Sequence, residues 1–483
     1  MVTSKYFIGA SVVGVVAVTA VALNRPAATA EFSAVDSNEK PNVIIVLLDD
    51  LGSMDVGFGG SLDIKTPHID RIAEEGVNCS EAYISAPYSG PSRCGLMSGR
   101  YQQRFGAEGN LGDESVEQEL GVPLTETLMS NVMKEQGYAT CAIGKWHLGD
   151  HESRWPQNRG FDHFYGFSGG GHNFWGTPGN MAQSKFVQEN GVPIKNNKTT
   201  YLTDEFSREA VEFIDKTSKT DNPFYIYLAY NAPHAPLQAP QRYLDRTKHI
   251  SNAQRSVYAA MVLAVDDGIG QIWEALERNN KLDNTMIIFL SDNGGTGDPG
   301  RAMNYPRRAF KGNMFDGGIR TPFAIYWKGR LQAGTTYDKT ISSLDIFPTV
   351  VTAAGFDPAN NKNPLDGVDL VPYLTGKKSS NPHKSLCWRV CGGMEYAIRM
   401  GDYKLVKTYY QEDYMLFNLK EDPIEMTDIA ACNGELVKKM AAEYMKWNSE
   451  MIAPSWEDNH APHQIQDHEA WELYRKKASG GRK

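Results

Sequence analysis

The stretch that decides the fold reads PNVIIVLLDD and runs from Pro41 to Asp50. Six consecutive apolar residues between polar ones are typical of a parallel strand that is buried on both faces, because such a strand needs no alternating polar positions. Similar apolar runs recur at Tyr138–Ile143, Phe224–Tyr230, Met286–Leu290 and Phe323–Tyr326. Helical patterns lie between them, at Thr125–Glu135, Asp204–Lys216 and Ser256–Asn279. Strands that alternate with helices predict an α/β fold with a large, mostly parallel sheet covered by helices on both faces.

The pattern changes after about residue 376. Strand-like pieces then follow one another at Ser385–Val390, Tyr396–Met400, Lys404–Thr408 and 416–419, and an amphipathic helix extends from about Glu435 to Met451. This order predicts a small antiparallel sheet with a packed helix. We therefore expect a large α/β domain over residues 31–375 and a small C-terminal α+β subdomain over residues 376–483.

The first thirty residues have the pattern of a signal peptide. Lys5 supplies a positive charge, Tyr6–Leu23 is an apolar run without charges, and Ala28-Thr29-Ala30 offers a small-residue cleavage site. A retained membrane anchor is the alternative, since the run approaches the length of a spanning helix. The position of the Ala-x-Ala site favours cleavage, so residues 1–30 are expected to be removed. The mature chain is then exported without stable membrane insertion.

The composition excludes several classes of protein. Hydrophobic residues make up 41% of the 483 positions and charged residues 22%, a balance that argues against a disordered or fibrous chain. The net charge of −9 argues against nucleic acid as a partner and requires any anion site to reverse the sign locally. The six cysteines form no CxxC pair, which excludes a zinc ribbon. Cys387 and Cys391 could pair after export, but they would be poorly placed for a disulfide on one strand.

Polar residues follow two of the predicted strands. Asp49 and Asp50 end the first, and Asp292 and Asn293 come directly after Met286–Leu290. Ligands of open α/β sheets bind beyond the carboxyl ends of the strands. Three carboxylates and an amide oxygen are hard ligands that suit calcium or magnesium. Capping of the following helices would explain either motif alone, but their occurrence at two strand ends favours a metal site.

The segment SGPSRCGLMSGR, from Ser89 to Arg100, carries a candidate nucleophile. It places the Ser89 hydroxyl just before a turn that leads into a helix, with Arg93 one turn further along. N–H groups at a helix start and a guanidinium suit a tetrahedral oxyanion. Taken alone, the segment is explained as well by a Gly-Pro-Ser turn that caps a helix.

The same segment resembles the signature of the type I sulfatases, Ser/Cys-x-Pro-Ser/Ala-Arg followed by Leu and a small residue with Gly. Further motifs of that family follow in order over most of the chain. They are Asp49-Asp50, GKWHLG at 144–149, APHAP at 232–236, SDNG at 291–294, Lys311-Gly312, GGIRTP at 317–322, RMGDYKL at 399–405 and LFNL at 416–419. The chain is therefore identified as a serine-type member of the formylglycine-dependent sulfatases, which have an alkaline phosphatase-like fold.

The resemblance implies a cofactor and a modification. Asp49, Asp50, Asp292 and Asn293, together with residue 89, would hold a calcium ion. Ser89 would be oxidised to formylglycine by a maturase before export. The hydrated aldehyde would attack sulfur and form a sulfoenzyme intermediate, which a plain serine could not resolve.

The resemblance also assigns roles to the basic residues. Arg93, Lys145, His234 and Lys311 would surround the sulfate, and His234 or Lys311 would protonate the departing sugar oxygen. His147 would deprotonate the second hydroxyl of residue 89, which expels sulfate. A lone Lys or His is more often a surface or core residue, but the nucleophile segment favours the catalytic reading here. Weaker candidates for substrate binding rim the pocket in Gly-rich or irregular segments: His172, Trp175, Arg301, Arg307 and Arg308.

The sequence thus predicts an exported, calcium-dependent sulfatase that acts on a sulfated polysaccharide or oligosaccharide, in the periplasm or outside a bacterial cell. The preference for a carbohydrate rests on family analogy. Two alternatives remain. A phosphoesterase or phosphonate hydrolase of the same superfamily would need more His and Asp ligands for zinc. A non-catalytic glycan-binding protein would keep Ser89 unmodified.

Overall fold

The computed structural model describes residues 39–112, 119–175, 186–194, 200–298, 300–409 and 411–456. The predicted signal peptide over residues 1–30 lies outside this part of the chain. Within it, no helix combines the length and the apolar character that crossing a membrane requires.

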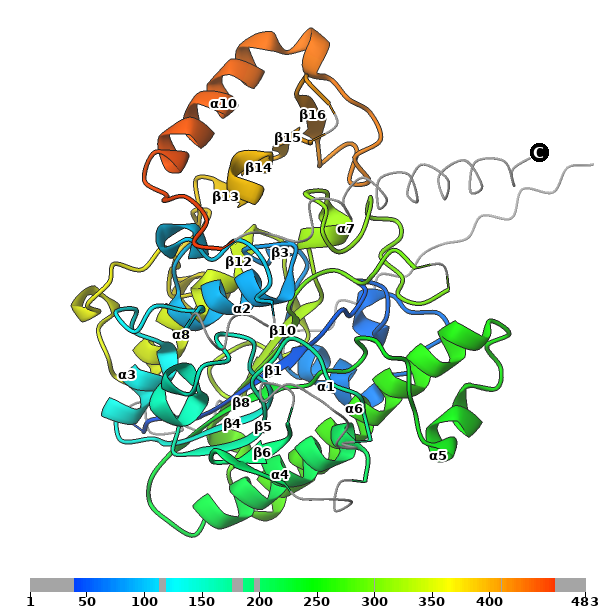
Figure 1. The fold of residues 1–483 in the computed structure, drawn as a ribbon, viewed down its shortest axis with the longest axis vertical. Coiled ribbons are helices and arrows are strands. Elements are labelled where there is room, and N and C mark those ends of the chain that lie inside the picture. The colour runs from blue at the N-terminus through cyan, green and yellow to red at the C-terminus, as the bar shows by residue number, and fades with distance from the viewer. Residues whose placement is uncertain are drawn as a thin grey trace, which may run out of the picture.

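A ten-stranded sheet forms the centre of the protein (Figure 1). Its strand order is β11-β2-β10-β9-β1-β8-β4-β5-β6-β7. Its five central strands are parallel: β9 (Thr285–Ser291), β1 (Asn42–Leu48), β8 (Phe224–Ala229), β4 (Ala139–Lys145) and β5 (His163–Phe167). The outer strands are β10 (Phe323–Trp327), β2 (Val77–Cys79), β11 (Thr335–Tyr337), β6 (Gln188–Glu189) and β7 (Val192–Pro193). The predicted mostly parallel sheet is confirmed, although β10 runs antiparallel to both of its neighbours.

Strand β1 shows why apolar and polar residues do not alternate along the central strands. Ile44, Val46 and Leu48 pack into one core, and Val43, Ile45 and Leu47 pack into a second core on the other face. The first core includes α1 (Pro67–Glu74), α4 (Leu202–Thr217) and α6 (Ala253–Arg278). The second includes α2 (Ser89–Ser98), α3 (Met129–Glu135) and α8 (Ile346–Ala353). Because helices cover both faces, every residue of the strand is apolar or buried.

Helices α3 and α6 begin three or four residues away from where the pattern predicts. The helix expected from Thr125 starts only at Met129, since the Asn131 side chain accepts a hydrogen bond from the N–H of Leu128 and stabilises an extended residue there. Helix α6 starts earlier than expected, because the Asn252 side chain caps it by accepting from the N–H of Arg255. Local side-chain contacts, rather than periodicity, set these ends.

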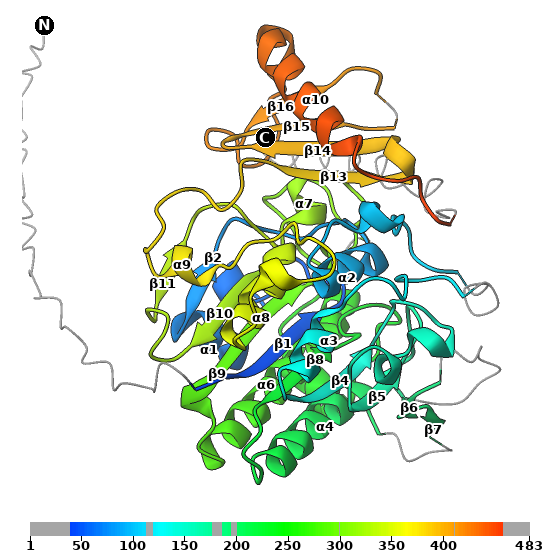
Figure 2. The same ribbon diagram turned by 90° about the vertical axis from the view of Figure 1, so that its left-hand side faces the viewer.

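A separate four-stranded antiparallel sheet forms the C-terminal part, as predicted, and lies at one end of the molecule (Figure 2). Its strands are β13 (Leu386–Val390), β14 (Glu395–Met400), β15 (Tyr403–Lys407) and β16 (Met415–Asn418). Helix α10 (Gly434–Asn448) packs on one face through Met440 and Tyr444. The other face contacts the main body, where Trp388 and Phe417 share a core with Phe315. Both Cys387 and Cys391 are free thiols.

The remaining described elements are short. Strands β3 (Ala82–Tyr83) and β12 (Ile341–Ser342) form a two-stranded parallel sheet. Helices α5 (Gln241–Leu244), α7 (Asp316–Ile319) and α9 (Val371–Leu374) span about one turn each. Helix α7 lies where the main body meets the C-terminal sheet (Figure 1).

A partly buried pair between His383 and Asp345 makes stability depend on pH. The Nε2 of His383 lies 2.8 Å from Asp345 Oδ1. Burial lowers the pKa of His383, but Asp345 outweighs this and holds the pKa above its ordinary value. The stabilisation is therefore complete below about pH 6.5 and is lost as pH rises through the folded-state pKa. We expect His383→Gln to lower the melting temperature by about 1–4 °C at pH 5.5 and by less at pH 9 in scanning calorimetry. Equal losses at both pH values would contradict a charged pair.

Candidate active site

Strand register brings the four predicted metal ligands together. Leu48 of β1 lies opposite Ser291 of β9, so the residues that follow leave the sheet side by side. The N–H of Asp50 donates to Asp292 Oδ1 over 3.3 Å, and Asn293 Nδ2 donates to Asp50 Oδ1 over 2.7 Å. The side chains of Asp49, Asp50, Asp292 and Asn293 are all buried. Three carboxylates and one amide thus converge from residues about 240 positions apart.

Ser89 lies against this cluster. Its Oγ is 3.0 Å from Asp49 Oδ1 and 3.0 Å from Asn293 Oδ1. Ser89 is the first residue of α2 itself, so the turn expected between Ser89 and the helix does not exist. The N–H of Gly90 donates to Asn110 Oδ1 over 2.9 Å, which ties down the start of the helix. Sequence reasoning missed Asn110, because a single Asn in an irregular segment carries no signal.

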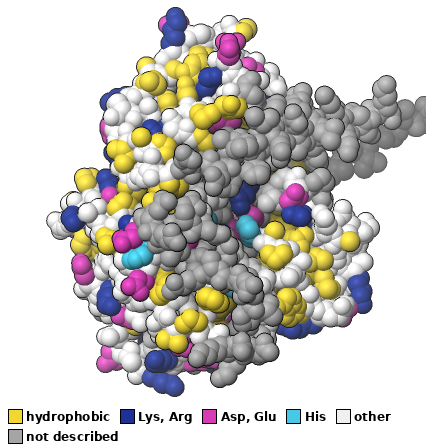
Figure 3. Space-filling view, viewed as in Figure 1, with side chains coloured by type: hydrophobic (Ala, Val, Ile, Leu, Met, Phe, Trp, Pro, Cys, Tyr) yellow, Lys and Arg dark blue, Asp and Glu magenta, His cyan; other side chains and the backbone are white. Residues whose placement is uncertain are grey.

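Three cations pair with the three carboxylates. Arg93 binds Asp292 Oδ2 through Nε at 2.9 Å and Nη2 at 2.8 Å. Lys145 Nζ lies 2.7 Å from Asp49 Oδ2, and Lys311 Nζ lies 2.6 Å from Asp50 Oδ1. The three positive charges therefore balance the three negative charges of the cluster. Basic, acidic and imidazole side chains also meet near the middle of the face drawn in Figure 3.

The pairing controls protonation. Burial is the largest influence on the pKa of Asp49 and of Asp50 and raises both, but the surrounding cations together outweigh it and lower both values: Lys145, His234 and Arg93 at Asp49, and Lys311 and His234 at Asp50. For Lys145 the balance is reversed, since burial lowers its pKa more than Asp49 raises it. The pKa of Lys311 is raised, because Asp50 and the other carboxylates outweigh burial. Asp49 and Asp50 are thus ionised and available to a cation at neutral pH.

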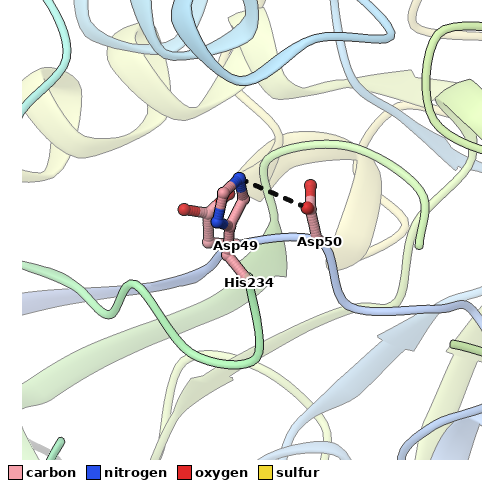
Figure 4. Close-up of side chains that lie close together, drawn as sticks. All are labelled: Asp49, Asp50 and His234. Atoms are coloured by element: carbon pink, nitrogen blue, oxygen red, sulfur yellow. Dashed lines mark ion pairs between the residues drawn. The ribbon is translucent and has the colours of Figure 1, made fainter. Parts of the chain in front are cut away.

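His234 lies next to Asp49 and Asp50, in the loop after β8 (Figure 4). Its Nε2 is 3.6 Å from Asp50 Oδ2, and its Nδ1 is 2.6 Å from the carbonyl oxygen of Ala235. A carbonyl oxygen only accepts, so Nδ1 carries a hydrogen and Nε2 faces the cluster. Ligand atoms of Asp49, Asp50 and His234 lie within 4.8 Å of one another, which makes His234 a further possible metal ligand.

His147 is buried beside the start of α2. Neither of its ring nitrogens has a hydrogen-bond partner among the described residues. A Cβ at Gly170 would lie 2.7 Å from His147 Nε2, so only glycine leaves room for the ring. Burial and the nearby Lys145 and Arg93 hold the pKa of His147 well below its usual range. The imidazole is therefore neutral at pH 7.

Two site residues have a left-handed backbone conformation that residues other than glycine rarely adopt. Asp50 has φ of 63° and His147 has φ of 61°. Such conformations cost on the order of 1–3 kcal/mol and persist where the surroundings impose them, often at functional sites. Both residues were selected from sequence as a ligand and a base.

The weaker candidates differ in their surroundings. His172 is buried, with Nδ1 2.6 Å from the Asn173 carbonyl oxygen, and Trp175 is 40% exposed. The other three are arginines with partners on the protein itself. Arg301 binds Asp298, Arg307 donates to the Arg320 carbonyl, and Arg308 donates to the Glu425 carbonyl. Burial and Arg320 lower the pKa of Arg307 to about 9.

Comparison with known families supports the resemblance. The family described as sulfatase matches residues 41–356, and the family described as N-sulphoglucosamine sulphohydrolase, C-terminal, matches residues 308–450. The Escherichia coli (strain K12) protein named uncharacterized sulfatase YdeN is 33% identical, with 83% of this chain and 84% of the relative covered. Arylsulfatase J of Mus musculus is 34% identical, with 86% and 76% covered. N-acetylgalactosamine-6-sulfatase of Sus scrofa is 31% identical, with 76% and 71% covered.

Solved structures agree in fold. The crystal structure of Ps i-CgsB in complex with k-i-k-neocarrahexaose has a TM-score of 0.82 and 39% identity, and covers 90% of this chain and 97% of that one. Phosphonate monoester hydrolase of Agrobacterium radiobacter, at 21% identity and a TM-score of 0.62, shares the fold. From the family matches and the relatives, this chain belongs to the sulfatase family, with the alkaline phosphatase-like fold, and is a sulfuric ester hydrolase.

Proposed function

We propose that the protein releases sulfate from a sulfated polysaccharide or oligosaccharide, with residue 89 as formylglycine and a calcium ion beside it. One observation carries the proposal: the Ser89 Oγ lies 3.0 Å from oxygens of both Asp49 and Asn293, where three carboxylates and three cations converge. A carbohydrate substrate is supported by relatives named for sulfated sugars and by the neighbour solved with a neocarrahexaose.

The donor set fits calcium. Asp49, Asp50, Asp292 and Asn293 offer only oxygens, which calcium prefers. Each carboxylate already binds one cationic side chain, yet an ionised carboxylate has about four lone-pair sites and retains capacity for a metal. The six charged side chains cancel, so a divalent ion would make this region positive despite the overall charge of −9. A bound calcium ion supplies a Lewis acid for the sulfate oxygens and the group at residue 89.

The exposure of the cations suggests how the substrate is oriented. The side chains of Arg93 and Lys145 are 0% and 1% exposed, whereas those of Lys311 and His234 are 17% and 26% exposed. The sugar must leave toward the open side, where Lys311 and His234 can protonate its oxygen. Arg93 and Lys145 bind the sulfate from the closed side.

His147 is the proposed base. Its neutral imidazole has two unpartnered ring nitrogens next to the start of α2, so it can take the proton from a hydroxyl of the modified residue 89. Removal of that proton would let the hydroxyl oxygen form the C=O bond of the aldehyde while the bond from the same carbon to the sulfate oxygen breaks, so that sulfate leaves.

We further propose that a maturase oxidises Ser89 before export, that the leader over residues 1–30 is cleaved, and that the enzyme works in the periplasm or outside the cell. The support is the charged start, the apolar run and the Ala-x-Ala site. We also propose that the chain divides into a large α/β domain over residues 31–375 and a small C-terminal subdomain over residues 376–483.

Peptide mass spectrometry over residues 83–100 tests the modification in protein from its native host. Conversion of Ser89 to formylglycine lowers the peptide mass by about two daltons, because two hydrogens are lost. The same sample is assayed on 4-nitrophenyl sulfate and 4-nitrophenyl phosphate. An unmodified Ser89 with faster phosphate release would support the phosphoesterase alternative. An unmodified Ser89 with glycan binding and no turnover would support the binding-protein alternative.

Metal removal is expected to abolish activity. Dialysis against a chelator should reduce sulfate release at least a hundredfold, since three carboxylates and the reacting group lose their shared cation. It should also lower the melting temperature, because the metal binds only the folded chain. Calcium should restore both quantities. Restoration by zinc and not by calcium would contradict the all-oxygen site and implicate His234 as a ligand.

A further inference from the structure

The loop that carries Lys311 is attached to both halves of the active site. The N–H of Lys311 donates to the Gly295 carbonyl over 3.0 Å, and the N–H of Gly312 donates to the Pro87 carbonyl over 3.0 Å. Gly295 follows the ligand Asn293 by two residues, and Pro87 precedes Ser89 by two residues. The loop therefore spans the metal ligands and the nucleophile helix, and its place decides where the Lys311 ammonium lies.

Both ends of this loop are held by Glu425, a buried residue of the C-terminal part. At the start, Arg308 Nη1 donates to the Glu425 carbonyl over 2.8 Å. At the end, the N–H of Asp316 donates to Glu425 Oε2 over 2.7 Å. The N–H of Gly317 also donates to the Arg308 carbonyl over 2.7 Å, which closes the loop on itself. A Cβ at Gly317 would lie 2.1 Å from the Ala309 carbonyl oxygen, so this closure requires glycine.

Lys404 of β15 completes the attachment. Its Nζ lies 2.7 Å from Asp316 Oδ1 and 2.8 Å from Glu425 Oε1, and the three side chains are fully buried. Tyr83 of the main body donates its hydroxyl hydrogen to Asp316 Oδ2 over 2.8 Å. A buried ion pair is a poor source of stability, because desolvation offsets the attraction, but its geometry is restrictive. These contacts therefore fix the position of the loop more than they stabilise the fold.

We propose that Glu425, with Lys404 and Asp316, is a positioning unit through which the C-terminal sheet sets the place of Lys311 in the active site. Among the described residues, Glu425, Lys404 and Asp316 form no hydrogen bond to the carboxylate cluster. They therefore act on it through the loop. The effect on catalysis rests on the proposed function of Lys311, whereas the structural coupling does not.

Amide hydrogen exchange on the full chain tests the coupling without turnover. We expect Glu425→Ala to raise exchange at least tenfold in peptides covering residues 308–319, including the N–H groups of Lys311 and Gly312. Glu425→Gln keeps an acceptor for the Asp316 N–H and should restore most of the protection. If Glu425→Ala does not fold, the double variant Lys404→Met/Glu425→Gln should still raise exchange in this loop, because Asp316 Oδ1 loses its contact with the Lys404 ammonium.

A matched control separates positioning from weaker docking of the C-terminal sheet. Arg389 of β13 forms a buried pair with Glu108, with Nε 2.9 Å from Oε1. Arg389→Met should raise exchange in β13 and leave residues 308–319 protected. Unchanged exchange of the loop in Glu425→Ala, or an equal increase in Arg389→Met, would overturn the proposal.

Kinetics then tests the consequence for Lys311. Phenyl sulfate has a more basic leaving group than 4-nitrophenyl sulfate and depends more on a proton donor. Glu425→Ala should lower kcat for phenyl sulfate about tenfold more than for 4-nitrophenyl sulfate, and Glu425→Gln should recover it. An altered loop with no selective loss would show that Lys311 is not the donor, while the coupling would stand. A wild-type protein inactive on every sulfate ester would instead count against the proposed function.

Discussion

Replacing Ser89 with alanine should reduce sulfate release by about four to six orders of magnitude. Alanine has no oxygen that can be oxidised to an aldehyde, so no nucleophile faces the sulfur. The change removes only one hydroxyl, whose contacts are Asp49 and Asn293, and the α2 backbone contacts with Tyr88 and Asn110 do not depend on it. The measurement is kcat from released sulfate by ion chromatography, with circular dichroism to verify the fold.

Ser98→Ala is the matched control for this variant. Ser98 lies at the other end of α2, is equally buried, and donates its hydroxyl hydrogen to the Cys94 carbonyl over 2.7 Å. Its loss should leave kcat within about threefold of the wild type, since surface and core hydroxyls away from the reaction affect stability rather than chemistry. Retention of more than one part in about a hundred of the activity by Ser89→Ala would rule out residue 89 as the nucleophile.

Arg93→Met should affect both activity and stability. The guanidinium makes two contacts with Asp292 and donates through Nη1 to the Lys145 carbonyl over 3.2 Å. Its removal leaves a buried carboxylate without its main partner, which costs about 3–5 kcal/mol. It also removes a cation from the closed side of the sulfate site, so kcat/KM should fall about a thousandfold. Thermal unfolding and initial rates measure the two effects.

The two effects can be separated with two further variants. Arg93→Lys keeps the charge but not the forked geometry, so it should recover part of the stability and little of the activity. Arg389→Met removes another buried arginine, which pairs with Glu108, and should lower the melting temperature with a small change in kcat. If Arg389→Met and Arg93→Met lowered kcat equally, the loss would reflect stability and not sulfate binding.

Much of the fold was predictable, and the reason lies in burial. The runs that became β1, β4, β8 and β9 are apolar, apart from Thr140 in the β4 run, because helices cover both of their faces. Strand β5, of sequence HFYGF, lacks that pattern and was missed. The strands at the sheet edges have two or three residues and form only because a neighbouring backbone is present. The antiparallel direction of β10 likewise depends on the path of the chain before it, which no local pattern records.

For the site, the sequence by itself determined which chemical groups are present: paired carboxylates at strand ends, a hydroxyl at a helix start and basic residues in short motifs. Only the tertiary structure decided which groups meet. The register between β1 and β9 places Asp50 beside Asp292, and the docking of β15 places Lys404 against Asp316. The tertiary structure also leaves both ring nitrogens of His147 without hydrogen-bond partners among the described residues. These outcomes depend on contacts between distant residues, because charge pairing and burial are properties of the assembled core and not of any segment.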